Sequence, residues 1–304
     1  MSGMWIAMGC LMMITGESSG SYRAIYTKML ISAPIGAAGY LLGYLASMPW
    51  GAVVVSMMVI GFVSALLSSK NRALSIGTLQ TLLVASIALG VPAIAPFWQP
   101  AVLYLIGAVF YALVLGVEIL IRGWHAQDTP NEKPSLELLS EKTAGPVASM
   151  IAPAVAFALC LGAAYGTHWI YDAAHWFWVP LTVGLVMKPD FGSIRDRALQ
   201  RIIGTLAGVL IGALTLAFVP KGLPLIAVLS ILAGILPWAM QRSYILQAVF
   251  LTPLVLILLD VIVPGTGDIN YGMQRLLDTA IGGFIVIVIG YMPLQYLRSR
   301  NKNP

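Results

Sequence analysis

The chain has 304 residues, of which 59% are hydrophobic and only 10% are charged. Soluble domains carry about 25% charged residues, and a soluble fold of this size could not hide so much apolar surface from water. The composition therefore excludes a soluble globular domain and predicts an integral membrane protein. The net charge of +5 does not indicate nucleic-acid binding, because the basic residues gather at the ends of apolar segments.

Apolar segments between polar, proline or glycine breaks predict an all-α, polytopic membrane protein with about eleven transmembrane helices. In chain order the helices are expected at 4–15, 23–47, 51–69, 73–91, 99–122, 147–171, 175–188, 195–219, 223–240, 244–263 and 272–297. The first of them is short, since a span needs about 20 apolar residues. It is a poor match to a signal peptide, because it lacks a basic start and a small-residue cleavage site.

The distribution of basic residues predicts the orientation. If the helices alternate in direction, all but two of the 17 Lys and Arg residues fall on one side of the membrane, and the exceptions are Lys221 and Arg275. Cytoplasmic loops are enriched in Lys and Arg. The C-terminus is therefore expected in the cytoplasm and the N-terminus outside.

The sequence also resembles itself at a spacing of 172 residues. Gly20-Ser21-x-Arg23 recurs as Gly192-Ser193-x-Arg195, and Gly36 falls on Gly208. The order and direction of the helices match as well, which predicts two parallel structural repeats of five plus six helices. Because 147–171 has no counterpart in the first repeat, we expect that the first repeat lacks its first helix, through truncation before Met1 or through loss.

These features divide the chain into four parts. Residues 1–122 form the first membrane unit, and residues 147–297 form the second. Residues 123–146 are polar and contain two prolines, which predicts a cytoplasmic linker too short to be a soluble domain. Residues 298–304 form a basic cytoplasmic tail.

A motif at the start of the second unit resembles a known family. It consists of Trp178-x-Pro180-Leu181-Thr182, then Pro189 and Gly192, and then Arg197-x-x-x-Arg201-x-x-Gly204-Thr205-x-x-Gly208. This pattern is similar to that of the fusaric-acid-resistance family, which includes aromatic carboxylic acid exporters and has plant aluminium-activated malate channels as distant relatives. The likeness is close over 176–214 and weaker over the rest of 147–297.

The resemblance implies a multi-pass protein of the bacterial inner membrane that exports aromatic or other organic carboxylic acids with the proton motive force. It implies small organic anions and membrane lipids as partners. One alternative is a passive organic-anion channel on the same fold. Another is an accessory or scaffold subunit that transports nothing, since the first unit lacks a helix and the cytoplasmic domain of many family members is absent.

The candidate substrate-binding residues lie around the motif. Arg197 and Arg201 are one helical turn apart, and a guanidinium presents a planar fork to a carboxylate. Arg195 is a third candidate. The short helix 175–188, which Pro180 interrupts, is expected to end near these arginines and to leave unwound backbone that lines a path. Pro180 and Thr182 are the remaining candidates. The alternative is that these arginines bind lipid phosphates or only set the topology.

Small residues predict close helix packing. Gly204, Gly208 and Gly212 recur every fourth residue, and Gly36 lies on the matching helix of the first unit. In lipid, such faces let helices approach closely. A substrate path along this face is the alternative, and the same motif is compatible with a homodimer.

Acidic residues within the spans are the candidates for proton coupling. These are Glu118, Asp260 and Asp278. Glu118 also stands four residues before Arg122, which predicts an ion pair at the membrane surface. A local pair with Arg275, three residues earlier, is the alternative for Asp278.

No enzyme is indicated. The sequence has no nucleophile elbow, zinc-protease motif or phosphate loop. The spacing of His168, Asp172 and His175 fits a metal site or pH sensor only if the helix is continuous there, so no metal and no cofactor are predicted. The aromatic residues Trp169, Tyr171, Trp176 and Trp178 are expected to form an interfacial belt rather than a stacking surface for substrates.

Overall fold

The computed structural model describes residues 2–16, 21–90, 96–123, 147–171, 175–187, 194–262 and 269–300. Within these ranges all regular elements are helices and there is no strand, which confirms the all-α prediction. The predicted linker lies almost wholly outside the described residues, and so do Asp172 and the basic tail beyond Arg300.

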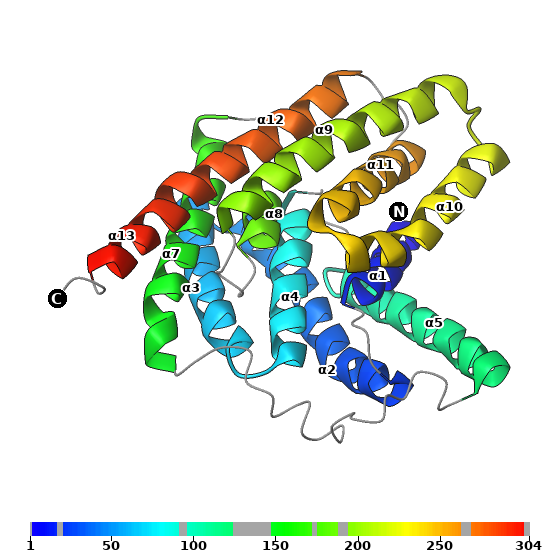
Figure 1. The fold of residues 1–304 in the computed structure, drawn as a ribbon, viewed down its shortest axis with the longest axis horizontal. Helices are drawn as coiled ribbons and strands as arrows, with labels where there is room; N and C mark the ends of the chain where they lie inside the picture. The colour runs from blue at the N-terminus through cyan, green and yellow to red at the C-terminus, as the bar shows by residue number, and fades with distance from the viewer. Residues whose placement is uncertain are drawn as a thin grey trace.

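The helices follow the apolar segments closely (Figure 1). Their bounds are α1 Ser2–Gly16, α2 Tyr22–Leu41, η1 Leu42–Ser47, α3 Trp50–Ser68, α4 Arg72–Gly90, α5 Gln99–Arg122, α7 Val147–Gly166, η2 Thr167–Trp169, α8 Trp178–Val186, α9 Ile194–Phe218, α10 Leu223–Arg242, α11 Tyr244–Ile262, α12 Ile269–Ile285, η4 Val286–Tyr291 and α13 Met292–Arg300. The last three are continuous and form one long rod beside α9 (Figure 1).

Polar side chains and glycines set several helix ends. The Ser21 hydroxyl accepts a hydrogen bond from the Ala24 amide at the start of α2, and Asn71 accepts one from the Leu74 amide at the start of α4. Both satisfy a backbone donor that has no partner within the helix. Gly123 and Gly222 have φ values of 89° and 118°, which side-chain-bearing residues rarely adopt.

Each of the eleven predicted segments contains a helix, but only eight of the described helices are long and apolar enough to cross a membrane. The prediction of a transmembrane helix at 175–188 was wrong. α8 has nine residues, which at about 1.5 Å per residue span about half of a hydrocarbon core. A turn at His175–Phe177 precedes α8, and all of its residues are buried by protein. The helix expected at 23–47 is also interrupted, because it continues after Leu41 as the 3₁₀ segment η1.

Two helix pairs pack in the same way in the two halves of the chain. α2 lies along α4, and α9 lies along α11. A Cβ added at Gly36 would lie 3.0 Å from Gln80 Oε1, and one added at Gly208 would lie 2.7 Å from Thr252 Cβ. Gln80 and Thr252 are separated by the same number of residues as Gly36 and Gly208, so the close contacts occur at corresponding positions.

The two halves meet along α3 and α7 and along α4 and α8. Aromatic side chains fill part of this contact: the Trp50 ring lies 4.8 Å from that of Trp176, and Trp50 donates a hydrogen bond to the Tyr165 carbonyl. The Tyr165 hydroxyl lies 2.9 Å from the Ser86 hydroxyl. The halves are therefore joined by buried polar contacts as well as by apolar packing.

Replacing Tyr165 by phenylalanine should lower the free energy of unfolding by about 1 kcal/mol, the usual net contribution of one hydrogen bond. The loss is modest because the Ser86 hydroxyl still donates to the Leu82 carbonyl. Thermal unfolding in detergent, with the exposed Tyr44→Phe as control, measures it. A Tyr165→Phe protein as stable as the wild type would show that this hydrogen bond does not hold the halves together.

Candidate functional site

Buried polar side chains gather where α8, α9, α11 and α12 meet in the second half. They are Thr182, Arg197, Arg201, Thr205, Gln247, Thr252, Arg275, Asp278 and Thr279. Charged groups inside a membrane protein are costly and mark functional sites by default. Among these described residues there are three arginines but one acid, so the cluster carries an excess of positive charge.

Helix α9 has one face with buried polar side chains and another face with glycines that pack against α11. Arg197, Arg201 and Thr205 recur every fourth residue and are all buried. Gly204 and Gly208 face α11: an added Cβ would lie 2.8 Å from the Ile245 carbonyl oxygen at the first position and 2.9 Å from that of Val249 at the second. The glycines bring the two backbones together, and this positions the start of α11 beside the arginines.

Arg201 is held by a tyrosine that also contacts α8. The Tyr244 hydroxyl donates a hydrogen bond of 3.1 Å to the Leu185 carbonyl and accepts one from Arg201. The Arg201 Nε and Nη1 atoms have no hydrogen-bond partner among the described residues, although the side chain is only 1% exposed. Arg197 and Arg275 also act on Tyr244 electrostatically. The site therefore offers buried cationic donors that an anion would satisfy.

Arg275 and Asp278 of α12 form a second charged group, which lies beside α8. The Arg275 guanidinium carbon is 4.0 Å from the centroid of the Trp178 ring, a cation–π contact between α12 and α8. Asp278 lies one turn further along α12 and is fully buried. Arg275 and the Tyr171 hydroxyl are the groups that act on it electrostatically.

The contacts between α9 and α12 fix the order of these groups along the bundle. Gly272 of α12 faces Val209, and Gly283 faces Ile202, so the two helices are antiparallel. Arg275 and Asp278 lie between these two contacts, on the side of Arg201 that leads toward the end of α9. The polar cluster is thus a column that begins at Arg197 and continues through Arg201 to Asp278 and then Arg275.

Threonines line the middle of the column. The Thr182 hydroxyl donates to the Trp178 carbonyl, and the Thr279 hydroxyl donates to the Arg275 carbonyl. The hydroxyl oxygens of Thr205 and Thr252 have no hydrogen-bond partner among the described residues. These groups add neutral donors and acceptors between the two cationic groups.

His175 lies in the turn before α8 and interacts with Gln274 in the first part of α12. Burial lowers its pKa below the usual value, against a hydrogen bond with Gln274 that raises it. A histidine with a lowered pKa is neutral at pH 7. It therefore adds no charge to the cluster at that pH.

The structure separates the candidate residues named above. Arg197, Arg201, Thr182 and Pro180 are buried around the column, whereas Arg195 is exposed at the start of α9. Gly212 packs more loosely than Gly204 and Gly208, with its nearest added-Cβ contact at 3.4 Å. Gly36 lies in the first half, away from the arginines.

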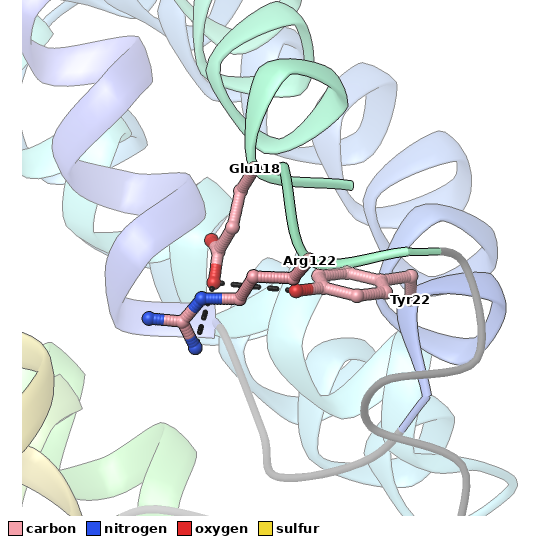
Figure 2. Close-up of polar contacts among 3 residues, drawn as sticks. All are labelled: Tyr22, Glu118 and Arg122. Atoms are coloured by element: carbon pink, nitrogen blue, oxygen red, sulfur yellow. Dashed lines mark hydrogen bonds and ion pairs between the residues drawn. The ribbon is translucent and has the colours of Figure 1, made fainter. Parts of the chain in front are cut away.

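The acidic candidates differ in their surroundings. Asp278 is buried in the column, and Asp260 lies in α11 but its side chain is outside the described part of the chain. Glu118 lies at the end of α5, where Figure 2 shows it between Tyr22 and Arg122. Its carboxylate is 3.4 Å from Arg122 Nη1 and accepts a hydrogen bond of 3.2 Å from the Tyr22 hydroxyl. The expected ion pair with Arg122 is present.

Replacing Glu118 by glutamine should change the free energy of unfolding by less than about 0.5 kcal/mol, because exposed ion pairs contribute little. The side chains of Arg122 and Glu118 are 63% and 35% exposed. Thermal unfolding together with anion flux in proteoliposomes checks this. A loss of flux in a stable Glu118→Gln protein would contradict a purely local ion pair and support Glu118 as a coupling residue.

The expected interfacial belt was wrong for two of its aromatic residues. Trp176 and Trp178 are 7% and 4% exposed, whereas Trp169 is 63% exposed. The first two are buried because the half-helix α8 starts inside the protein rather than at the lipid surface. Trp178 thereby reaches Arg275.

Sequence reasoning also missed Tyr244, Thr205 and Thr252 as members of the cluster. Thr205 could have been found, since it continues the four-residue spacing of Arg197 and Arg201. Tyr244 and Thr252 gave no signal, because only the packing of α11 against α9 brings them there.

The first half has no equivalent pair of arginines. The residues 172 positions before Arg197 and Arg201 are Ile25 and Met29, and both are buried. Gln80 corresponds to Thr252, and it donates to the Met12 carbonyl while accepting from the Tyr104 hydroxyl. The cationic column is therefore a feature of the second half.

Comparison with known proteins matches this second half. Residues 149–289 match the model of the family described as fusaric acid resistance protein-like. Inner membrane protein YccS of Escherichia coli (strain K12) is 32% identical over 158 residues, which cover 52% of this chain and 22% of YccS. Membrane protein YvaC of Bacillus subtilis (strain 168) is 30% identical over 116 residues, which cover 38% of this chain and 18% of YvaC.

The chain thus spans only about a fifth of the length of these two relatives. No solved structure matches it. The family match contains the whole of α8, α9, α11 and α12, which are the helices that build the column. Residues 149–289, which contain the buried arginine column, are therefore similar to the fusaric acid resistance protein-like family.

Proposed function

We propose that this chain is a multi-pass transporter of the inner membrane that moves organic carboxylates, aromatic acids among them, out of the cell. The family match and the apolar helices support a membrane protein connected with transport. The name of the relative YccS supports the inner membrane. In this proposal the protein is not an enzyme, its C-terminus is cytoplasmic, and the two halves are parallel repeats of one helical unit.

One observation carries the proposal: Arg201 is buried in a membrane helix, and two of its donor atoms have no hydrogen-bond partner among the described residues. Leaving a buried charge without sufficient partners is strongly destabilising. A carboxylate has two oxygens that accept hydrogen bonds from a guanidinium in one plane. An organic acid bound at Arg201 would remove the deficit, and Arg197 lies one turn nearer the predicted cytoplasmic side.

The membrane potential supplies a driving force of the right sign. Moving one elementary charge across 100 mV is worth about 2.3 kcal/mol, and a negative cell interior drives anions outward. The electrical part of the proton motive force is therefore sufficient for export. Coupling to proton movement through Asp278, Asp260 or Glu118 stays a prediction, for which Asp278 is the buried candidate.

A passive anion channel is the second candidate, because the excess of positive charge in the column would attract anions in either case. The two differ in their kinetics. A transporter saturates and exchanges a labelled acid for an unlabelled one, whereas a channel carries a continuous current. Planar-bilayer recording of the purified protein separates them.

The test is efflux from proteoliposomes that hold hydroxybenzoates, fusaric acid or small dicarboxylates under an inside-negative potential. We expect efflux of one class of acid from vesicles with the wild-type protein, and none from protein-free vesicles. Folded protein that releases none of these acids would contradict transport and favour an accessory subunit.

A further inference from the structure

Asp278 is a buried acid in the column and lies close to Arg275. It is on the same face of α12 as Arg275, three residues away, and its side chain has no exposed area. Neither carboxylate oxygen has a hydrogen bond of good geometry with a described residue. Its electrostatic partners are Arg275 on its own helix and Tyr171 in the segment after η2.

Arg275 is the next cation that an anion leaving Arg201 would meet. The residues from Arg201 to Thr205 advance by about 6 Å along α9, and the antiparallel contacts of α12 place Arg275 and Asp278 near the level of Thr205. The Trp178 ring holds the Arg275 guanidinium from the α8 side. A carboxylate that moves outward thus passes from Arg201, which has no acidic neighbour among the described residues, to Arg275, which has Asp278 on the side that faces Arg201.

Building on the proposed function, we propose that Asp278 is an internal competitor of the transported carboxylate at Arg275, which lowers the affinity there and releases the anion outward. Both carboxylates require the same guanidinium, and two anions close together repel each other. The inner position at Arg201 keeps its affinity, because the group that acts on Arg201 electrostatically is Tyr244 and not an acid of the described residues. Affinity therefore falls along the direction of export.

The other ionisable groups around Asp278 do not supply this competition. Tyr171 and Tyr244 are neutral phenols at pH 7, and the remaining charges of the column, Arg197 and Arg201 on α9, are positive. His175, in the turn before α8, interacts with Gln274.

The test measures binding of benzoate, as a simple aromatic carboxylate, to the purified full chain in lipid nanodiscs. Asp278→Asn removes the negative charge at almost constant volume, and we expect it to bind benzoate at least about tenfold more tightly than the wild type. Benzoate should also raise the unfolding temperature more in this variant, because ligand stabilisation grows as Kd falls. Net benzoate efflux should be slower, since release is impaired.

Three further variants make the result specific. Asp196→Asn, the same change at an exposed position of α9, should bind benzoate like the wild type. Asp278→Ser should show the same gain as Asp278→Asn, and adding Arg275→Gln to Asp278→Asn should remove the gain. Wild-type affinity in both Asp278 variants, with binding abolished by Arg201→Gln, would overturn the competitor role and leave the proposed function intact. Unchanged binding in Arg201→Gln would instead overturn the proposed function.

Discussion

Replacing Arg201 by glutamine is expected to abolish transport of the organic acid while leaving the fold at least as stable as before. Removing one partner of a buried charge pair costs about 2–5 kcal/mol of binding free energy, which corresponds to a loss of affinity between about thirtyfold and several thousandfold. The stability of the free protein should not fall, because two donor atoms of the buried guanidinium have no hydrogen-bond partner in the part of the chain that the structure describes. Uncharged glutamine removes the free-energy cost of the buried charge.

The opposite signs of the two effects distinguish a binding residue from a structural one. Efflux from proteoliposomes measures the first effect, and thermal unfolding without any organic acid measures the second. Arg195→Gln is the matched control, since it makes the same change on the same helix at an exposed position. It should leave both quantities within error of the wild type.

Arg201→Lys tests the geometry of recognition. Lysine keeps the charge but has no planar fork, so we expect transport weaker than the wild type but stronger than Arg201→Gln. If Arg201→Gln unfolded at a much lower temperature and retained efflux in the folded fraction, Arg201 would be a structural residue and the anion site would lie elsewhere.

The sequence was sufficient for the parts of the fold that depend on local composition. Apolar runs and their breaks located a helix in every predicted segment, because in lipid a backbone must satisfy its own hydrogen bonds. The length of α8 was not predictable in this way. Residues 175–188 are apolar enough for a longer helix, and what shortens it is the turn at His175–Phe177 and its enclosure by α4, α7, α9 and α12.

The site was predictable only where its residues share one helix. Arg197 and Arg201 stand one turn apart, and that spacing is visible in the sequence. Tyr244 and Arg275 come from α11 and α12, and their approach to the arginines depends on how three helices pack. Trp178 was expected at the membrane interface but is buried for the same reason, since residues distant in the chain decide whether an aromatic side chain is buried.

Replacing Gly208 by leucine should prevent the second half from folding into its native form. A Cβ at this position would lie 2.7 Å from Thr252 Cβ, 2.9 Å from the Val249 carbonyl oxygen and 3.0 Å from Pro253 Cδ. Two of these neighbours are rigid, because one is backbone and the other is a proline ring. α9 and α11 must therefore separate, and overpacking of this kind costs about 1–3 kcal/mol even for single methylene groups.

Gly234→Leu on α10 is the matched control, because no atom lies within 4 Å of an added Cβ there. Glycine is a poor helix former, so this change should stabilise the helix by up to about 1 kcal/mol. The fraction of protein that remains monodisperse after heating in detergent compares the two, with Gly208→Ala expected between Gly208→Leu and the wild type. Since α9 carries Arg201 and α11 carries Tyr244, any folded Gly208→Ala protein should also bind the anion more weakly. Equal heat resistance of Gly208→Leu and the wild type would mean that α9 and α11 lie further apart than the Gly208 contacts indicate, and that other contacts position the arginines.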